Sequence, residues 1–245
     1  MRLLLIAFQF LTIIPLPVAV RCEKGDLGRS TTFFPLVGCV IGGLLVTANV
    51  LVSPWIAHPL SDALLITLLT LITGAIHLDG LADVCDGLAA RGSRERFLAI
   101  MKDSQVGAIG AVGLVLGLLL KWQALLAVPL ELKWQALLFF PALARFGQVL
   151  TLTGARNARQ DGLGAAFVQG SGYVSLLLAF VTVAVGGYYL MGLKGVAALA
   201  AVCVFTVFGR MFFQRKLGGL TGDTIGCISE LNEILVLVVF SIIVE

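Results

Sequence analysis

The chain alternates between long apolar stretches and short polar loops from about residue 34 to its last residues. Apolar runs of this length with few charges are typical of helices that cross a membrane. The expected spans cover about residues 34–56, 63–78, 106–120, 134–153, 173–192, 195–213 and 234–244. We therefore expect an all-α polytopic integral membrane helix bundle with about six to seven transmembrane helices.

The N-terminal stretch 3–20 is also apolar, but Gln9, Pro15 and Pro17 interrupt it. Two prolines so close together do not suit a straight spanning helix. We expect an interfacial or re-entrant helix that packs beside the bundle and contacts the lipid bilayer. A cleaved signal peptide is the alternative, although no small-residue A-x-A cleavage pattern follows the stretch.

Composition excludes a soluble fold. Hydrophobic residues make up 59% of the 245 residues, charged residues only 13%, and the mean hydropathy is +1.02. The sequence therefore predicts one integral membrane domain, residues 1–245. A formal net charge of +3 is too small to indicate a nucleic-acid partner, and five cysteines without a C-x2-C pair indicate reduced thiols.

Basic residues predict the orientation of the chain in the membrane. Twelve of the 17 Lys and Arg residues fall in four alternate polar segments: 21–31, 79–104, 154–172 and 210–233. The opposite connections are expected to contain three lysines: Lys121, Lys133 and Lys194. Because cytoplasmic loops carry the excess of positive charge, the first group is expected to face the cytoplasm of a bacterial inner membrane.

Three aspartates follow the second expected span, at spacings of four and three residues. At about 100° per residue, Asp79, Asp83 and Asp86 fall within an arc of roughly 60° on one helix face. Two carboxylates about 6 Å apart repel by roughly 3 kcal/mol at an effective dielectric constant of about 20. A solvated polar face is the alternative, but carboxylates beside a membrane helix favour a functional site that holds Mg²⁺.

The residues after the triad suit an anionic partner of that metal. Arg91, Arg94 and Lys102 are expected to bind phosphate oxygens, with Ser104 beside them, and Asp103 is expected to close the metal site. His77 lies on the opposite helix face from Asp79, so we expect it to pack or to form a hydrogen bond.

Glycines are expected to serve both packing and substrate approach. Gly38 and Gly42 form a small-x3-small pattern that lets a neighbouring helix come close. At the start of the third span, Gly107 and Gly110 are expected to bring backbone N–H groups to a phosphate. Further along, Gly113 is expected to pack against a helix.

A second acidic group lies in the last polar segment. Gly219 and Thr221 are expected to bind phosphate, and Asp223 and Glu230 are expected to complete the active site, with Glu233 one turn further on. The alternative is an N-capped helix whose acids complement its dipole. The predicted active-site segments are therefore 77–110 and 210–233.

Three arginines outside these segments are also candidates. Arg156 and Arg159, in the glycine-rich loop 154–172, are candidates to bind phosphate. Arg145, inside the fourth span, either extends to the membrane interface or faces the polar site.

Acidic, basic and glycine-rich segments on one side of a membrane fit phosphoryl transfer, in which metal ions and arginines neutralise a diphosphate. The stretch from Asp83 to Arg91 matches the first half of the CDP-alcohol phosphotransferase motif, D-x2-D-G-x2-A-R. The second half fails, because Ile100 stands where that motif requires glycine.

Five ordered motifs carry a more specific resemblance. They are FQFLTIIPLP at 8–17, FFPLVG at 33–38, HLDGLADVCDGLAAR at 77–91, MKDSQVGAIG at 101–110 and GGLTGDTIG at 218–226. Together they make the chain similar to the cobalamin-5′-phosphate synthase, or adenosylcobinamide-GDP ribazoletransferase, family. The resemblance runs from the first helix to the last loop.

This resemblance implies a reaction that spacing alone does not. The family joins adenosylcobinamide-GDP to α-ribazole or its 5′-phosphate with Mg²⁺, forming adenosylcobalamin or its 5′-phosphate and releasing GMP. Mapped onto this chain, the metal ligands would be four aspartates: Asp79, Asp83, Asp86 and Asp103. Arg91, Arg94 and Lys102 would neutralise the diphosphate, and Asp223 and Glu230 would bind a second metal or orient the attacking hydroxyl. A homo-oligomer, or association with other enzymes of the corrinoid pathway, stays open.

Three alternatives differ in what they predict. A CDP-alcohol phosphotransferase of lipid synthesis would release CMP. An ion-coupled transporter would place its acids near the centres of the spans, whereas these acids cluster at the cytoplasmic ends. A non-catalytic membrane scaffold would tolerate neutral substitutions across the aspartate triad.

Overall fold

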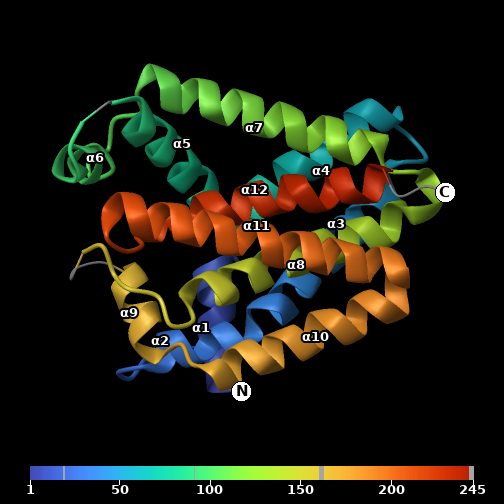
Figure 1. Ribbon diagram of the computed structural model, residues 1–245. Coiled ribbons are helices and arrows are strands. Elements are labelled where there is room, and N and C mark those ends of the chain that lie inside the picture. Colours follow the sequence, from blue (N-terminus) through green and yellow to red (C-terminus); the bar gives the residue numbers. More distant parts are fainter. Residues whose placement is uncertain (19, 91, 160–162, 243–245) are drawn as a thin grey trace.

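The computed structural model describes residues 1–18, 20–90, 92–159 and 163–242 (Figure 1). Two short 3₁₀ turns, Thr31–Phe33 and Leu130–Leu132, join a set of α-helices. These helices are α1 (Arg2–Leu11), α2 (Asp26–Ser30), α3 (Phe34–Val52), α4 (His58–Thr73), α5 (Ile76–Ala89), α6 (Arg94–Ile100), α7 (Ala108–Ala127), α8 (Lys133–Leu152), α9 (Leu163–Gly170), α10 (Tyr173–Met191), α11 (Leu193–Leu217) and α12 (Gly222–Ile242). Among the described residues, the β-type pairing is limited to one isolated bridge, between Asn157 and Leu220.

The expected all-α membrane bundle is confirmed. In the described part of the chain, six helical segments are long and apolar enough to cross a membrane, and the number is seven if the bent pair α4–α5 counts as one span. The six segments contain α3, α7, α8, α10, α11 and α12. Helix α1 has ten residues, which corresponds to about 15 Å, so it is too short to cross alone.

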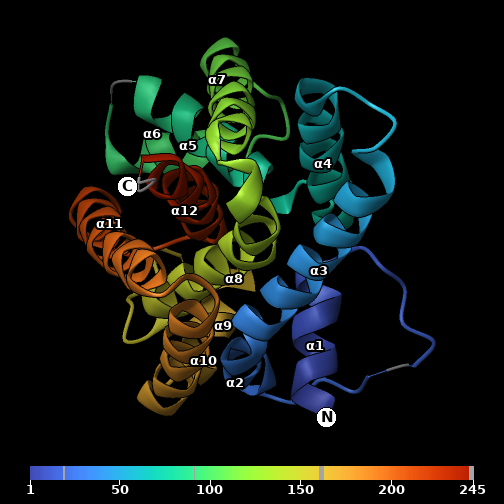
Figure 2. The ribbon, with the colours of Figure 1, turned by 90° about the vertical axis from the view of Figure 1, so that its right-hand side faces the viewer.

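Helix α8 lies at the centre of the bundle, with α3, α10, α11 and α12 around it (Figure 2). Gly38 and Gly42 of α3 face its backbone closely. A Cβ atom on Gly38 would lie 2.5 Å from Ala142 Cα, and one on Gly42 would lie 2.2 Å from Leu138 O. The expected packing role of these glycines is therefore confirmed.

The prediction of one continuous helix over 63–78 is wrong. Helix α4 ends at Thr73, and α5 starts at Ile76 after a bend of 92°. Gly74 and Ala75 both take positive φ angles, 60° and 56°, which no α-helix can continue through. The helix that carries the three aspartates therefore turns away from α4 and packs against α12.

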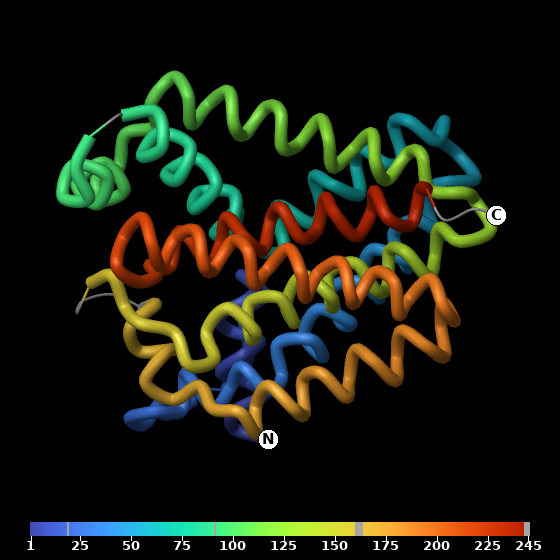
Figure 3. Tube along the Cα trace, in the orientation of Figure 1, coloured from blue at the N-terminus to red at the C-terminus, as the bar shows by residue number. Residues whose placement is uncertain are grey.

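The four basic segments gather at one end of the bundle. Figures 1 and 3 show α2, α5, α6, α9 and the junction of α11 with α12 at the left end, and the turn between α10 and α11 at the other. This arrangement agrees with the predicted alternation of the loops.

Two lysines do not lie in loops as expected. Lys121 belongs to α7 and Lys133 begins α8, and both are buried. Lys121 Nζ pairs with Glu230 and, at 2.6 Å, with Glu233, while Lys133 Nζ lies 2.8 Å from Asp62 Oδ2. These two lysines are held by buried carboxylates, so they do not report the topology of the chain.

We expect the substitution Lys121→Met to destabilise the protein by about 3–5 kcal/mol, because it leaves the buried Glu230 without its cation and removes one of the two cations that Glu233 contacts. The melting temperature of purified protein in detergent measures this change. The double substitution Lys121→Met/Glu230→Gln should recover part of the loss. A melting temperature of Lys121→Met equal to that of the wild-type protein would contradict the predicted effect.

Candidate active site

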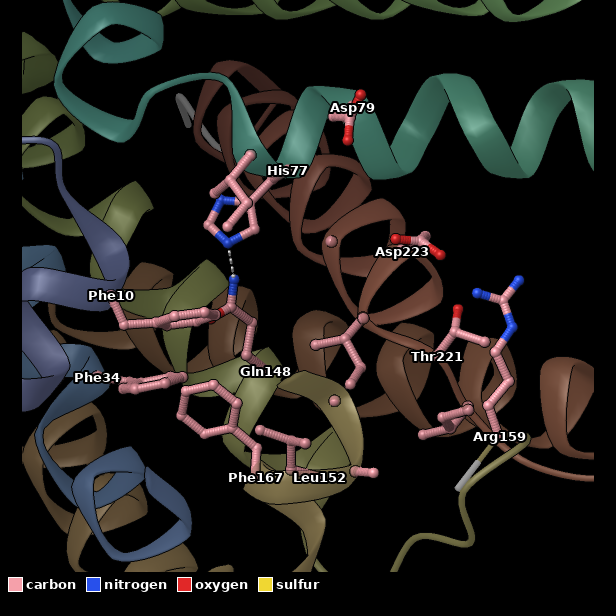
Figure 4. A pocket seen from close by; sticks show the side chains of 17 residues that line it. Phe10, Phe34, His77, Asp79, Gln148, Leu152, Arg159, Phe167, Thr221 and Asp223 are labelled. Carbon is pink, nitrogen blue, oxygen red and sulfur yellow. Dashed lines mark hydrogen bonds between the residues drawn. The ribbon is translucent and has the colours of Figure 1, made fainter. Parts of the chain in front are cut away.

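A cavity of about 310 Å³ opens among α1, α3, α5, α8, α9 and α12 (Figure 4). Its two ends differ in chemistry. Four apolar side chains line one end: Phe10, Phe34, Leu152 and Phe167. Four polar side chains line the other: Asp79, Arg159, Thr221 and Asp223. The side chains of His77 and Gln148 lie between them.

The polar end exists because α5 and α12 pack backbone against backbone. A Cβ atom on Gly80 of α5 would lie 2.6 Å from the carbonyl oxygen of Asp223, so only glycine allows this approach. The contact brings Asp223, one member of the second acidic group, to the aspartates of α5. The Asp83 carboxylate is repelled by those of Asp79, Asp223 and Asp86 and is attracted by Arg159.

Asp86 is turned toward the start of α7. Its two carboxylate oxygens accept hydrogen bonds from the backbone N–H groups of Gly107 and Gly110, each at 2.7 Å. A carboxylate at this position satisfies free N–H groups and complements the helix dipole. The N–H groups expected to bind phosphate at Gly107 and Gly110 are therefore already paired with Asp86.

Gly219 and Thr221, at the junction of α11 with α12, take part in packing and in backbone hydrogen bonds. A Cβ atom on Gly219 would lie 2.4 Å from the backbone of Asn157 and Ala158, so this glycine is required for close packing. Thr221 exchanges hydrogen bonds with Thr224, since the N–H of each residue donates to the hydroxyl of the other, at 3.0 and 3.2 Å. Of these two predicted phosphate-binding residues, Thr221 lines the cavity.

The predicted residues around α6 lie outside the cavity. Arg94 donates from Nε to Leu217 O at 2.6 Å and from Nη2 to Ala158 O at 2.8 Å, so it links α6 to the end of α11 and to the loop after α8. Lys102, Asp103 and Ser104 are exposed, and none of them is among the cavity-lining residues of the described chain. Arg91 lies outside the described residues.

Glu230 was expected to be catalytic, but it is buried inside the bundle and pairs with Lys121. The same network continues from Glu233 to Arg145, whose Nη1 lies 2.7 Å from Glu233 Oε1. Arg145 is fully buried, so it does not extend to the membrane interface. This network therefore stabilises the helix packing instead of presenting an acid to the cavity.

Arg159 is the basic side chain that the described structure places at the cavity, and it attracts Asp83 and Asp223. It belongs to the loop whose arginines were expected to bind phosphate.

Sequence reasoning missed the apolar end of the cavity and Gln148. Phe10 and Phe34 stand within the family motifs, and a glutamine inside an apolar span is a recognisable signal of function.

The donor set at the polar end suits Mg²⁺. Among the described residues, no three His, Cys, Asp or Glu side chains form a complete metal cage. Mg²⁺ does not need such a cage, because it usually takes one or two carboxylates and completes its shell with water and substrate phosphate. Asp79 and Asp223 at the cavity, with Asp83 beside them, supply oxygen ligands of this kind.

Comparisons with known proteins agree with the family resemblance that the five sequence motifs carry. The family model described as cobalamin-5-phosphate synthase matches residues 3–241. An adenosylcobinamide-GDP ribazoletransferase of Geotalea daltonii is 55% identical over 97% of this chain and 96% of its own. Proteins of the same name from Clostridium novyi and Caldanaerobacter subterraneus are 34% and 32% identical, over 96% and 99% of this chain and 94% and 99% of theirs. No solved structure matches the chain.

We expect Gly110→Ala to destabilise the protein by about 1–3 kcal/mol, because the new Cβ atom would lie 2.2 Å from Asp86 Oδ2 and break the paired hydrogen bonds. Thermal unfolding in detergent measures the effect.

Gly43→Ala is the matched control, because a Cβ atom on Gly43 would meet nothing within 4 Å. That variant should be at least as stable as the wild-type protein, since alanine favours the helix. Equal stability of both variants would argue against a strained approach at Gly110.

Proposed function

Because the chain belongs to the cobalamin-5-phosphate synthase family, we propose that it is a transferase with adenosylcobinamide-GDP ribazoletransferase activity. The reaction joins adenosylcobinamide-GDP to α-ribazole or its 5′-phosphate. The products are GMP and adenosylcobalamin or its 5′-phosphate, which completes the nucleotide loop of the cobalamin.

One observation carries this proposal in the structure: the acids of α5 and α12 meet beside Arg159 at the polar end of a cavity. A diphosphate substrate brings several negative charges to the site. Carboxylates alone would repel it, so the site needs both a cation and the guanidinium group. Phosphoryl transfer in proteins relies on this combination of metal ions, arginines and positioned hydroxyl groups.

We assign the following roles. Asp79 and Asp223 would hold Mg²⁺, with Asp83 beside them, and the bound ion would neutralise diphosphate charge and the charge that develops on the leaving group. Arg159 binds phosphate oxygens. Asp86 holds the start of α7 against α5 and thereby positions the other two aspartates of that helix.

The chemical step is one displacement at phosphorus. The acceptor hydroxyl oxygen forms a bond to the phosphorus on the corrinoid side of the diphosphate. The bond between that phosphorus and the bridging oxygen breaks, and GMP leaves with this oxygen. The hydroxyl proton passes to a carboxylate at the polar end of the cavity, where Asp79 and Asp223 both lie.

We place the protein in the bacterial inner membrane with the acidic end of the bundle toward the cytoplasm. Support comes from the twelve Lys and Arg residues in the segments near this end. Nucleotide substrates and Mg²⁺ are available on that side. The family membership favours GMP over the CMP that a CDP-alcohol phosphotransferase would release.

We expect Asp223→Asn to lower the rate of GMP release at least about 100-fold, because it removes an oxygen ligand and a charge from the reacting centre. Purified protein with adenosylcobinamide-GDP, α-ribazole and Mg²⁺ provides the assay.

Glu95→Gln is the matched control, since it changes the same charge on an exposed side chain of the neighbouring α6. Its rate should stay within about twofold of the wild-type rate. Wild-type turnover by Asp223→Asn would remove α12 from the proposed site, and absence of GMP from folded wild-type protein would refute the proposed reaction.

Treatment with EDTA is expected to abolish GMP release, and Mg²⁺ in excess of the chelator should restore it. Ca²⁺ should restore less activity, because it prefers more ligands at longer distances. Turnover that persists after chelation and gel filtration would argue against the metal assignment while leaving the transferase reaction intact.

A further inference from the structure

Three aromatic rings meet at the apolar end of the cavity, and each comes from a different helix. The ring centroids of Phe10 and Phe167 lie 4.4 Å apart, those of Phe34 and Phe167 5.7 Å, and those of Phe10 and Phe34 5.9 Å. All three rings line the cavity, and Phe34 and Phe167 are almost fully buried. The bundle therefore offers a preformed aromatic surface beside the polar end.

Two buried polar groups border this surface. Gln148 Nε2 lies 2.7 Å from His77 Nε2 and donates to Ser229 Oγ at 2.8 Å. This leaves Gln148 Oε1 and His77 Nδ1 buried without a partner, on side chains that are 1% and 5% exposed. With Nε2 accepting from the amide, Nδ1 carries the proton. Both atoms have almost no accessible surface, so they lie behind the wall of the cavity that the two side chains line.

The size of the cavity decides which part of the substrates it can hold. A volume of about 310 Å³ is at the lower end of the range for small-molecule pockets. It suits a group of nucleoside size. A corrinoid ring system is several times larger, so the corrinoid has to stay outside.

The lining then distinguishes between the two bases of the reaction, the dimethylbenzimidazole of α-ribazole and the guanine of the GDP group. Guanine carries a carbonyl, an amino group and ring nitrogens that each need a hydrogen-bond partner. Against phenylalanine rings most of these groups would stay unpaired, which is unfavourable. Dimethylbenzimidazole presents an apolar edge with two methyl groups, and its flat ring can stack on the aromatic surface.

We propose that this cavity is the binding site of the acceptor nucleoside, with the dimethylbenzimidazole base against Phe10, Phe34 and Phe167 and the ribose toward Asp79 and Asp223. Gln148 and His77 line the cavity between the base and the acids. The inference rests on the proposed function for the identity of the ligand. It implies that adenosylcobinamide-GDP reaches the acids from outside the cavity, so the acceptor is seated inward of the diphosphate.

The test compares Phe167→Leu with Phe208→Leu, the same substitution on an exposed, lipid-facing side chain of α11. Phe167→Leu should raise the KM for α-ribazole about tenfold and leave the KM for adenosylcobinamide-GDP within about twofold. Phe208→Leu should change neither constant. An increase confined to the KM for adenosylcobinamide-GDP, or no change in either constant, would overturn the assignment.

Binding of α-ribazole alone separates this inference from the proposed reaction. α-Ribazole should raise the melting temperature of the wild-type protein in detergent, and ribosylbenzimidazole without the two methyl groups should require about a tenfold higher concentration for the same shift. The shift should be smaller in Phe167→Leu and unchanged in Phe208→Leu. If α-ribazole binds in this way but no GMP is released, the subsite is supported and the proposed reaction is refuted. If GMP is released but guanosine raises the melting temperature more than α-ribazole does, the subsite alone is refuted.

Discussion

The close approach of α5 to α12 at Gly80 is the constraint on which the candidate site depends. The contact between Gly80 and the backbone of Asp223 joins two helices, α5 and α12, that lie more than a hundred residues apart in the sequence. The acids on the two helices repel one another, so apolar packing around the contact and the positive charge of Arg159 must offset this repulsion. Helix packing thus brings the site together, although the negative charges of the site oppose this packing.

The sharp bend at Gly74 and Ala75 makes this approach geometrically feasible. A straight continuation of α4 would send the aspartates in a direction that differs by 92° from the one they take. Instead α5 packs across α12, and the backbone N–H of Ile13 donates to Ile72 O at the end of α4, at 2.8 Å. The segment that follows α1 is therefore joined to the bend, and α1 contributes Phe10 to the cavity.

Local patterns in the sequence predicted the fold class, the spans other than 63–78, and the shared face of the three aspartates, because these depend on hydrophobicity and helical period. The roles of individual aspartates were harder to predict. Asp79 and Asp86 share a face but are separated by about 10 Å along the axis, so the start of α7 reaches only Asp86. The bend was also hard to predict, because Ala75 takes a positive φ angle and alanine, unlike glycine, does not indicate such a turn in a sequence. Lys121 was misplaced because its partners are more than a hundred residues away.

That separation has a consequence for how the protein is made. Lys121 lies 109 and 112 residues before the two glutamates that neutralise it. During synthesis, α7 enters the bilayer before α12 exists, so its cation has no counter-charge at that stage. Lys133 differs, because Asp62 precedes it in the chain. Lys121 is therefore paired only once α12 has been made, so this ion pair links α7 to a helix that is synthesised much later.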